Sequence, residues 1–533
     1  MHYLYKALIA STSLLATPFI ILLSIQWSRT RLAPPNIPWA GLNNKRLFPK
    51  LRANLREITA KRDPLLEGYE KYSKHGQPFI LPSLNWPDVV LPPSHIPWLI
   101  SFPDNVLSTS SVFEDVLATK YLGHGPDLAA IVDFSVIRRD LTRHLNATLP
   151  DILDEVRASF DESIEPLLSS DEDWADVKIV EIILNTARRL SNRAFVGESL
   201  CRNKRFMSAL KSWEFAIGIC SAVIRYLVPQ CLQPMLGPVI ALPVRFQDWK
   251  LKRLVLPVLY ERLAAQSGSD EKDVKPPPND VLQWLLDAKL AGRDAAARMT
   301  LSEIAHKTVF LNFFAVHTTA LNTSSTLHNI LTSTQPPTPS LIQTLLTETA
   351  PLLPTLSQNP TTLRSQTPAL DSVIRESLRF KPMNGRGLGR EVVAPTGLTT
   401  PDGLYLPCGT HVCVVFGPRQ LDEGVWERGG KFAPLRFYRE GGDEGGTTEE
   451  KEDVGKAAVH ITEDFMSFGL GRHACPGRFF AVQAMKIILA TLITRYEFQP
   501  LEEPMPLLEM GEVSTPSEKA TVKMRRRREE VLG

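Results

Sequence analysis

The chain has 533 residues and a net charge of +2, and its basic residues are not interleaved with aromatic side chains, so nothing indicates a nucleic-acid-binding protein. Its six cysteines show neither a disulfide-like nor a zinc-like pattern, which fits a reducing compartment. This length would usually mean several domains, but no repeat or linker divides residues 45–533, so we predict one large domain there.

The amino terminus contains one long apolar segment. The stretch from Ala7 to Trp27 is almost uncharged and has about the 20 residues that cross a bilayer. Arg29 and Arg31 follow at once, and positive charge after a span favours the cytosolic side. The alternative is a cleaved signal peptide, which needs a shorter apolar core and a cleavage site that we do not find. We predict three parts: an anchor at 1–32, a stiff proline-rich hinge at 33–44 and the folded domain at 45–533.

The domain is predicted to be mostly helical with a small β region. Apolar positions recur at helical spacing over residues 152–165 and 177–195. Short strand-like pieces occur at residues 78–82, 89–91, 403–406 and 411–416. The glycine- and acid-rich stretch 441–455 is predicted to be a disordered insertion. Asn146 begins a glycosylation sequon by pattern only, and on the cytosolic side it would be unused.

The longest predicted helix lies in the middle of the chain. Thr300 and Glu303 have the spacing of a capping box, and the apolar run that begins there continues to about Leu331. A threonine hydroxyl inside the run, as at Thr318, can bond the carbonyl four residues back and open the helix locally. The preceding residue, His317, is either a group that titrates near neutral pH or a satisfied polar residue of the core.

A charged pair lies on a later predicted helix. Glu376 and Arg379 are three residues apart, so their side chains lie on one helical face and can pair. This spacing alone usually marks a solvated surface pair. Here the flanking residues are apolar, which favours a buried pair: Leu370, Val373, Ile374, Leu378 and Phe380.

The most informative stretch is the loop from Phe468 to Gly477, which places Cys475 after two glycines. Gly469 and Gly471 can take positive φ and let the backbone pass close to a flat ligand. No set of zinc ligands lies nearby, so a thiolate here suits a metal already held by a cofactor, and haem iron is the obvious candidate.

Other residues of this loop have physical roles under the same interpretation. Backbone N–H groups in such a turn can point at the sulfur and hold it as thiolate. Phe468 can keep water away from it, and Gly477 can admit close approach of the following helix, predicted at 478–496. The alternative is a glycine-rich turn with a buried free cysteine, as most lone cysteines are.

These motifs resemble those of the cytochrome P450 family. The pattern Phe-x-x-Gly-x-x-x-Cys-x-Gly resembles its haem-binding loop, and the string GRHACPGRFFA is most similar to filamentous-fungal members of specialised metabolism. Glu376-x-x-Arg379 resembles the family's buried pair, which a downstream arginine, here Arg436, joins. Many fungal members also carry His-Thr-Thr in the central helix, although the commonest pattern has a small residue, glycine and an acid at Phe314, Ala315 and His317.

The resemblance implies a mostly α cytochrome P450 fold behind one N-terminal transmembrane helix, with haem b bound through Cys475. Its propionates would be bound by His473, by Arg390 (with Arg386 as a rival) and by Arg143, although the family's usual Trp-x-x-x-Arg is missing. The other implied roles are loop residues around the haem (Phe468, Gly471, Gly477), a proton relay (Thr318, with His317 and Thr319 beside it) and a structural core (Glu376, Arg379, Arg436).

The function implied by the resemblance is that of a haem-dependent monooxygenase of the endoplasmic reticulum membrane, with a cytosolic catalytic domain. Electrons would come from NADPH through NADPH–cytochrome P450 reductase, or in addition from cytochrome b5. The expected pocket lining is apolar, which suits a lipophilic substrate, terpenoid by analogy and otherwise polyketide or alkaloid: Phe310, Phe313, Phe314, Val316 and residues 106–122. Two other classes stay open, an oxygen-independent haem-thiolate isomerase or dehydratase and a non-catalytic haem- or sterol-binding membrane protein.

Overall fold

The computed structural model describes most of the chain from residue 62 onward. The described ranges are 62–83, 87–122, 134–168, 173–267, 277–293, 295–438, 457–510 and 513–528, with short pieces at 34, 36–42, 49–50 and 52–54. The anchor predicted at 1–32 and the insertion predicted at 441–455 therefore lie outside the described residues, as does part of the hinge predicted at 33–44.

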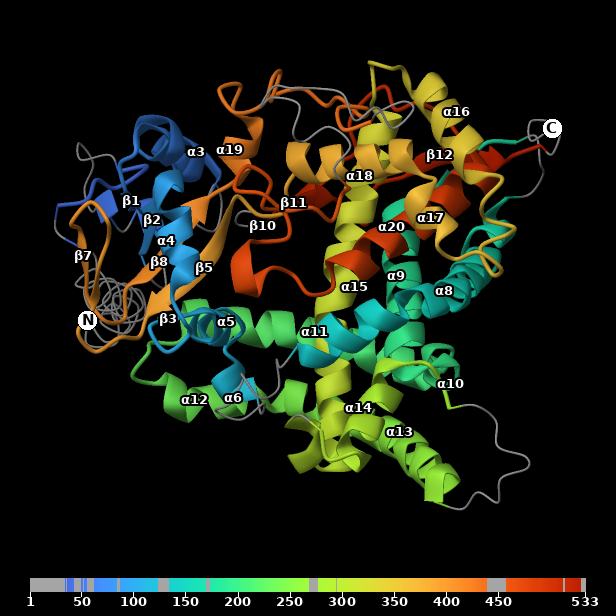
Figure 1. Cartoon of the computed structure of the whole chain (residues 1–533), viewed down its shortest axis with the longest axis horizontal. Helices are drawn as coiled ribbons and strands as arrows, with labels where there is room; N and C mark the ends of the chain where they lie inside the picture. The colour runs from blue at the N-terminus through green and yellow to red at the C-terminus, as the bar shows by residue number, and fades with distance from the viewer. Residues whose placement is uncertain are drawn as a thin grey trace, which may run out of the picture.

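Helices make up most of the described chain (Figure 1). Those of the first half are α3 (Arg62–Lys71), α4 (Ile96–Ser101), α5 (Thr109–Leu117), α6 (Thr119–Leu122), α8 (Thr142–Ser163), α9 (Ile179–Val196), α10 (Glu198–Cys201), α11 (Lys204–Ala222), α12 (Gln233–Ile240) and α13 (Leu242–Ser267). Those of the second half are α14 (Val281–Leu290), α15 (Leu301–Leu331), α16 (Thr338–Thr349), α17 (Thr362–Ser365), α18 (Pro368–Phe380), α19 (Gly417–Leu421) and α20 (Arg478–Arg495).

The largest sheet lies to one side of the helices, at the left of Figure 1. It has five strands in the order β1 (Phe79–Leu81), β2 (Asp88–Leu91), β8 (His411–Val415), β5 (Arg386–Val392) and β3 (Leu107–Ser108). Only the pair β2–β8 is parallel. Three smaller sheets contain β4 (Ala175–Val177), β12 (Val522–Arg526) and β9 (Tyr496–Phe498); β10 (Leu507–Met510) and β11 (Val513–Pro516); and β6 (Leu398–Thr399) and β7 (Tyr405–Leu406).

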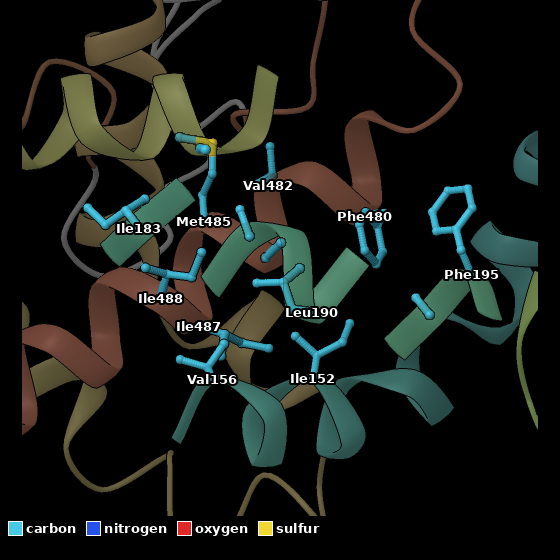
Figure 2. Packing of buried hydrophobic residues seen from close by; sticks show 14 of the residues in the cluster. Ile152, Val156, Ile183, Leu190, Phe195, Phe480, Val482, Met485, Ile487 and Ile488 are labelled. Atoms are coloured by element: carbon cyan, nitrogen blue, oxygen red, sulfur yellow. The ribbon is translucent and has the colours of Figure 1, made fainter. Parts of the chain in front are cut away.

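The main hydrophobic core lies where α8, α9 and α20 meet. Figure 2 shows Ile152 and Val156 of α8 beneath Leu190 of α9, with Ile487 and Ile488 of α20 beside them. All five side chains are almost fully buried. A side chain of this kind contributes about 1.5–3 kcal/mol when it leaves water. The core therefore fixes α20, the helix that begins just after the cysteine loop, against α8 and α9.

The predicted helices and strands largely agree with the structure. The capping box at Thr300 and Glu303 is present and starts α15, which runs to Leu331 as predicted. The helix expected at 152–165 instead begins at Thr142 and contains Pro150. Proline lacks one N–H and usually marks a helix boundary. The apolar face of α8 continues on both sides of Pro150 through Leu145, Leu149 and Ile152, and its burial outweighs the lost hydrogen bond.

The mostly helical fold with a small β region is thus confirmed, whereas the N-terminal transmembrane helix stays a prediction. Among the described residues, one helical segment, Lys204–Leu227, is long and apolar enough to cross a membrane, and 39% of that window is buried. It comprises α11 and the following turn Val223–Leu227, and α11 packs against α13. We therefore treat it as part of the folded domain.

A buried charge network joins α18 to the segment after α19. Glu376 and Arg379 are both fully buried and form two hydrogen bonds of 2.8 Å, while Arg436 Nε donates to Glu376 Oε2 at 3.0 Å. The remaining N–H groups of Arg379 donate to the backbone carbonyls of Gln420, Gly429 and Lys431. The structure thus brings together the three residues that the sequence suggested as a structural core.

Replacing Glu376 with alanine should destabilise the fold strongly. The change leaves the buried Arg379 guanidinium without its carboxylate, and such a loss typically costs about 3–5 kcal/mol. The free energy of unfolding, measured in denaturant, should fall by that amount. The matched control is Glu67→Ala, which breaks the exposed pair with Lys71 and should cost about 1 kcal/mol or less. Equal stability of the two variants would contradict the structural role.

Candidate functional site

The backbone of the cysteine loop is held in a fixed shape by glycines and short hydrogen bonds. Gly469 and Gly471 have φ of +69° and +70°, where other residues are strained. The Cys475 N–H donates to the Phe468 carbonyl at 2.8 Å, which closes the loop. A Cβ at Gly471 would lie 3.2 Å from Ile100 of α4, so a larger residue there would also press on its neighbour.

Gly477 does not have the role expected from the sequence. A Cβ at this position would meet only Ile137 Cγ2, at an ordinary contact distance of 3.9 Å, and its φ of −87° suits any residue. Close approach of α20 therefore does not require glycine here. Within the protein, the space in front of Gly477 is open to a further group.

A glutamine that sequence reasoning missed ties the cysteine loop to the buried charge network. The amide of Gln420 in α19 donates to the carbonyls of Leu378 and Arg379 at 3.3 and 3.1 Å. Its oxygen accepts from the backbone N–H of Met466 at 3.3 Å, two residues before Phe468. The start of the loop is therefore fixed to the end of α18, where Arg379 binds Glu376. An amide serves this purpose because it donates and accepts at once.

The sulfur of Cys475 lies in surroundings that are suited to a metal-bound thiolate. Burial raises the pKa of the Cys475 thiol, and hydrogen bonds from the backbone N–H groups of Gly477 and Arg478 oppose that rise. The thiol form is thus favoured until a cation binds the sulfur, and the N–H groups then stabilise the anion. Across the described residues, no group of three or more His, Cys, Asp or Glu side chains could hold a metal. A metal at Cys475 would need its other ligands from a cofactor.

A buried guanidinium without a carboxylate lies near the loop. Arg390 of β5 is only 4% exposed, and the acceptor within the described residues is the carbonyl of Gly389, at 2.8 Å. Burial lowers the pKa of Arg390 to about 10, with the Asp104 charge acting in the opposite direction. An arginine remains charged at neutral pH, so a buried one calls for an anion. The rival candidate, Arg386, already pairs with Asp88 of β2.

His473 and Arg138 belong to the same cluster of positive groups. His473 Nε2 lies 3.0 Å from Asp104 Oδ1, and burial, then the charge of Arg390, lower the pKa of its imidazole. Arg138 also acts on His473 electrostatically and donates to the Arg472 carbonyl at 3.3 Å. Arg143, which the sequence suggested, is exposed, and no hydrogen bond or ion pair joins it to another described residue. The structure places Arg138 at this site instead, because the helical turn Ile137–Leu141 brings it to the loop.

These residues fit a haem. One half-buried cysteine offers a single thiolate, two backbone N–H groups face its sulfur, and a Cβ at Gly477 would meet only Ile137. Arg390 and Arg138 supply positive charge for the carboxylates of the porphyrin, and a ring N–H of His473 can donate a hydrogen bond to them. A lone structural cysteine would not call for a buried guanidinium near its loop.

The central helix α15 presents a partly exposed stretch in its middle. Thr318 is exposed, and its hydroxyl donates to the Phe314 carbonyl at 2.7 Å, as predicted for a threonine at this place. Thr319 is buried, and its hydroxyl has no hydrogen-bond partner among the described residues. Its role beside Thr318 stays a prediction.

His317 lies beside Thr318 and contacts a carboxylate that the sequence did not reveal. Its Nε2 is 3.2 Å from Oε2 of Glu214, on α11, and its side chain remains 37% exposed. Glu214 is 3% exposed at its side chain and pairs with the equally buried Arg188 of α9 at 2.9 Å. Burial alone would raise the pKa of Glu214, but His317 and Arg188 outweigh it and keep the pKa below its usual value.

Aromatic rings form the wall next to Thr318. Phe314 packs edge-to-face against Phe313 of the same helix, Phe113 of α5 and Phe134, with ring centroids 5.6–6.3 Å apart. Phe313 and Phe314 are partly buried, as expected for lining residues. Phe310 and Val316 are almost fully buried, and their place in the pocket lining stays a prediction.

Comparisons with known proteins agree with this geometry. Residues 120–524 match the family model described as Cytochrome P450. The chain is 28% identical over 527 residues to Cytochrome P450 monooxygenase lnaC of Aspergillus flavus, which covers 98% of this chain and 97% of that protein. It is 29% identical over 502 residues to Cytochrome P450 monooxygenase polB of Polytolypa hystricis, covering 93% and 94%. It is also 29% identical to Cytochrome P450 monooxygenase gloP of Glarea lozoyensis, covering 92% and 91%. The predicted resemblance is confirmed, and the chain belongs to the cytochrome P450 family.

Proposed function

We propose that this chain is a haem-thiolate monooxygenase of fungal secondary metabolism that oxidises a lipophilic small molecule. The observation that carries the proposal is the fixed backbone around Cys475 together with the buried Arg390, for which no ion pair is found among the described residues. The names of the fungal relatives support the same activity. When bound, haem supplies the activation of O2, so that one oxygen atom enters a C–H bond of the substrate and the other leaves as water, with two electrons and two protons consumed.

The chain's own residues would bind the cofactor and deliver protons to the reaction. Cys475 would be the iron ligand, and Arg390, His473 and Arg138 would bind the propionates. The assignment of Arg138 over Arg143 is testable, because Arg138→Ala should lower the haem content of the purified protein and Arg143→Ala should not. Thr318 would hold a water by its hydroxyl and help to supply the protons that the reaction consumes. The electrons would come from NADPH through a membrane-bound reductase, with cytochrome b5 as an additional donor.

The substrate side of the proposal rests on the aromatic wall. Phe313 and Phe314 present partly exposed rings next to Thr318, and the ionisable side chain identified beside them is His317. Such a surface favours an apolar molecule with few polar groups. We propose a terpenoid, with a polyketide or an alkaloid as alternatives. Difference spectra recorded with members of each class would decide among them, since a bound substrate shifts the haem absorbance.

Replacing Thr318 with alanine should slow product formation and uncouple it from NADPH use. The loss of a positioned proton donor typically costs about 10²–10⁴-fold in rate. Product and hydrogen peroxide should be measured together with NADPH consumption, using the full chain and a reductase. The variant should keep its haem but convert NADPH mainly into hydrogen peroxide.

The control for this experiment is Thr308→Ala. Thr308 makes the same hydrogen bond, to the Ile304 carbonyl at 2.8 Å, but lies ten residues upstream and is buried. Its loss should leave coupling unchanged. Unchanged coupling and yield in Thr318→Ala would defeat the proton-relay role. Product formed without NADPH or O2 would favour the oxygen-independent isomerase or dehydratase.

We further propose that residues 7–27 anchor the chain in the endoplasmic reticulum membrane with the domain in the cytosol. Deleting residues 1–32 should weaken membrane attachment without loss of haem binding. Residual attachment is expected through an exposed apolar surface on α11, α12 and α13: Phe215, Ile219, Leu227, Met235, Val239, Leu242, Phe246 and Trp249. Membrane fractionation measures both effects. A glycan on Asn146, which is exposed in α8, would show the opposite orientation.

A further inference from the structure

A buried carboxylate faces the middle of α15, next to the residue proposed to relay protons. Oε2 of Glu214 accepts hydrogen bonds from Arg188 Nε at 3.1 Å and Nη2 at 2.9 Å, and lies 3.2 Å from His317 Nε2. The second oxygen, Oε1, is buried without a hydrogen-bond partner among the described residues. Glu214 therefore joins α9, α11 and α15 at one point, although no motif in the sequence marks it.

The charge state of Glu214 determines which nitrogen of His317 carries hydrogen. Arg188 is buried beside the carboxylate and neutralises it, so the carboxylate stays ionised. An ionised carboxylate can only accept hydrogen bonds. His317 Nε2 must then be the nitrogen that holds hydrogen, since it faces Glu214. In the neutral ring, Nδ1 is left as the proton acceptor.

The His317 side chain is partly exposed, unlike the two groups that hold it. The His317 side chain is 37% exposed and adjoins Thr318, whereas Glu214 and Arg188 are at most 5% exposed. The other described neighbour of the ring is Phe313, at 5.9 Å between centroids, which carries no ionisable group. The ionisable groups that face His317 in the described residues are thus Glu214 and, behind it, Arg188.

We propose that Glu214 is a positioning residue that fixes His317 with hydrogen on Nε2 and leaves Nδ1 free to accept and return protons beside Thr318. This inference rests on the proposed monooxygenase function. Glu214 itself touches neither substrate nor haem.

A second histidine of α15 shows what a purely structural pair looks like in the same helix. His306 Nδ1 lies 2.6 Å from Asp248 of α13, and Lys252 pairs with the same carboxylate at 2.8 Å. A cation, a carboxylate and an imidazole meet here as at Glu214, although His306 uses Nδ1 and the two partners bind different oxygens of Asp248. The His306 side chain is only 10% exposed, however, and it lies three turns away from Thr318. The pair Asp248–His306 is therefore a matched control for Glu214–His317.

The test compares Glu214→Gln with Asp248→Asn in the full-length, haem-containing protein. Glutamine is similar in shape but can donate as well as accept, so it no longer fixes the ring. Glu214→Gln should lower the fraction of NADPH electrons that reach product by roughly 10-fold, the smaller loss typical of an outer-shell partner. Asp248→Asn should leave coupling unchanged.

The tautomer of His317 can be measured without catalytic turnover. With 15N-labelled histidine, the wild-type spectrum should contain a signal typical of the Nε2–H form, assigned by its loss in His317→Gln. That signal should change in Glu214→Gln and persist in Asp248→Asn. If Glu214→Gln fails to fold because Arg188 loses its partner, His317→Gln keeps the Glu214–Arg188 pair and should show the same loss of coupling.

Several results would overturn the inference. These are a wild-type tautomer signal of the Nδ1–H form, normal coupling in Glu214→Gln, and an equal loss of coupling in Asp248→Asn. The double variant Glu214→Gln/His317→Gln should be no worse than either single variant, and additive losses would likewise contradict it. A wild-type protein with the Nε2–H signal but no NADPH-dependent product would refute the proposed function while leaving the positioning of His317 intact.

Discussion

The site depends on the rigid connection between Glu376 and the cysteine loop. Arg379 is fully buried and satisfied on one side by Glu376 and on the other by carbonyls of residues 420–431. Gln420 continues the connection to Met466, and Cys475 N–H closes the loop on Phe468. A buried charge of this kind tolerates few alternative arrangements, since any shift leaves a group unpaired. The position of the sulfur is thus determined by polar contacts on one side of the loop and by the packed helix α20 on the other.

The helix α15 is buried along most of its length but exposes polar side chains where the reaction is proposed to occur. Over most of its length it is buried, with side chains such as Val309 and Leu327 in the core. Near Thr318 this burial is relaxed. The Thr318 hydroxyl bonds the Phe314 carbonyl of the same helix, whereas His317 is held by a carboxylate of a neighbouring helix. Glu214 comes from α11 and Arg188 from α9, two helices that also pack against the core. The exposed groups beside the haem site are therefore oriented by a rigid shell.

Sequence reasoning succeeded where one residue type has few alternatives. Cys475 with its glycines, the capping box at Thr300 and the pair Glu376–Arg379 are local patterns with a direct physical cause. It failed for contacts between distant segments. Gln420 and Glu214 carry no local signal, because an amide or a carboxylate becomes informative only when the fold brings a partner to it.

The arginines proposed to bind the haem propionates show that sequence reasoning can also fail within a short stretch of chain. Arg138 and Arg143 both lie near the start of α8, and the sequence cannot tell which of them faces the loop. The irregular turn Ile137–Leu141 changes the helical phase before α8 begins, and this turns Arg138 toward Arg472. Helical periodicity alone could not predict that change. The start of α8 before Pro150 was missed for a related reason, since burial of its apolar face outweighs a local rule.

The most direct test of the central claim, that the Cys475 thiolate binds haem iron, is the carbon monoxide difference spectrum of the reduced protein. The wild type should show the thiolate-type absorbance, and Cys475→Ala should lose it. Cys408→Ala, which removes an exposed cysteine away from the loop, should retain it. A thiolate-type spectrum in Cys475→Ala would contradict the account.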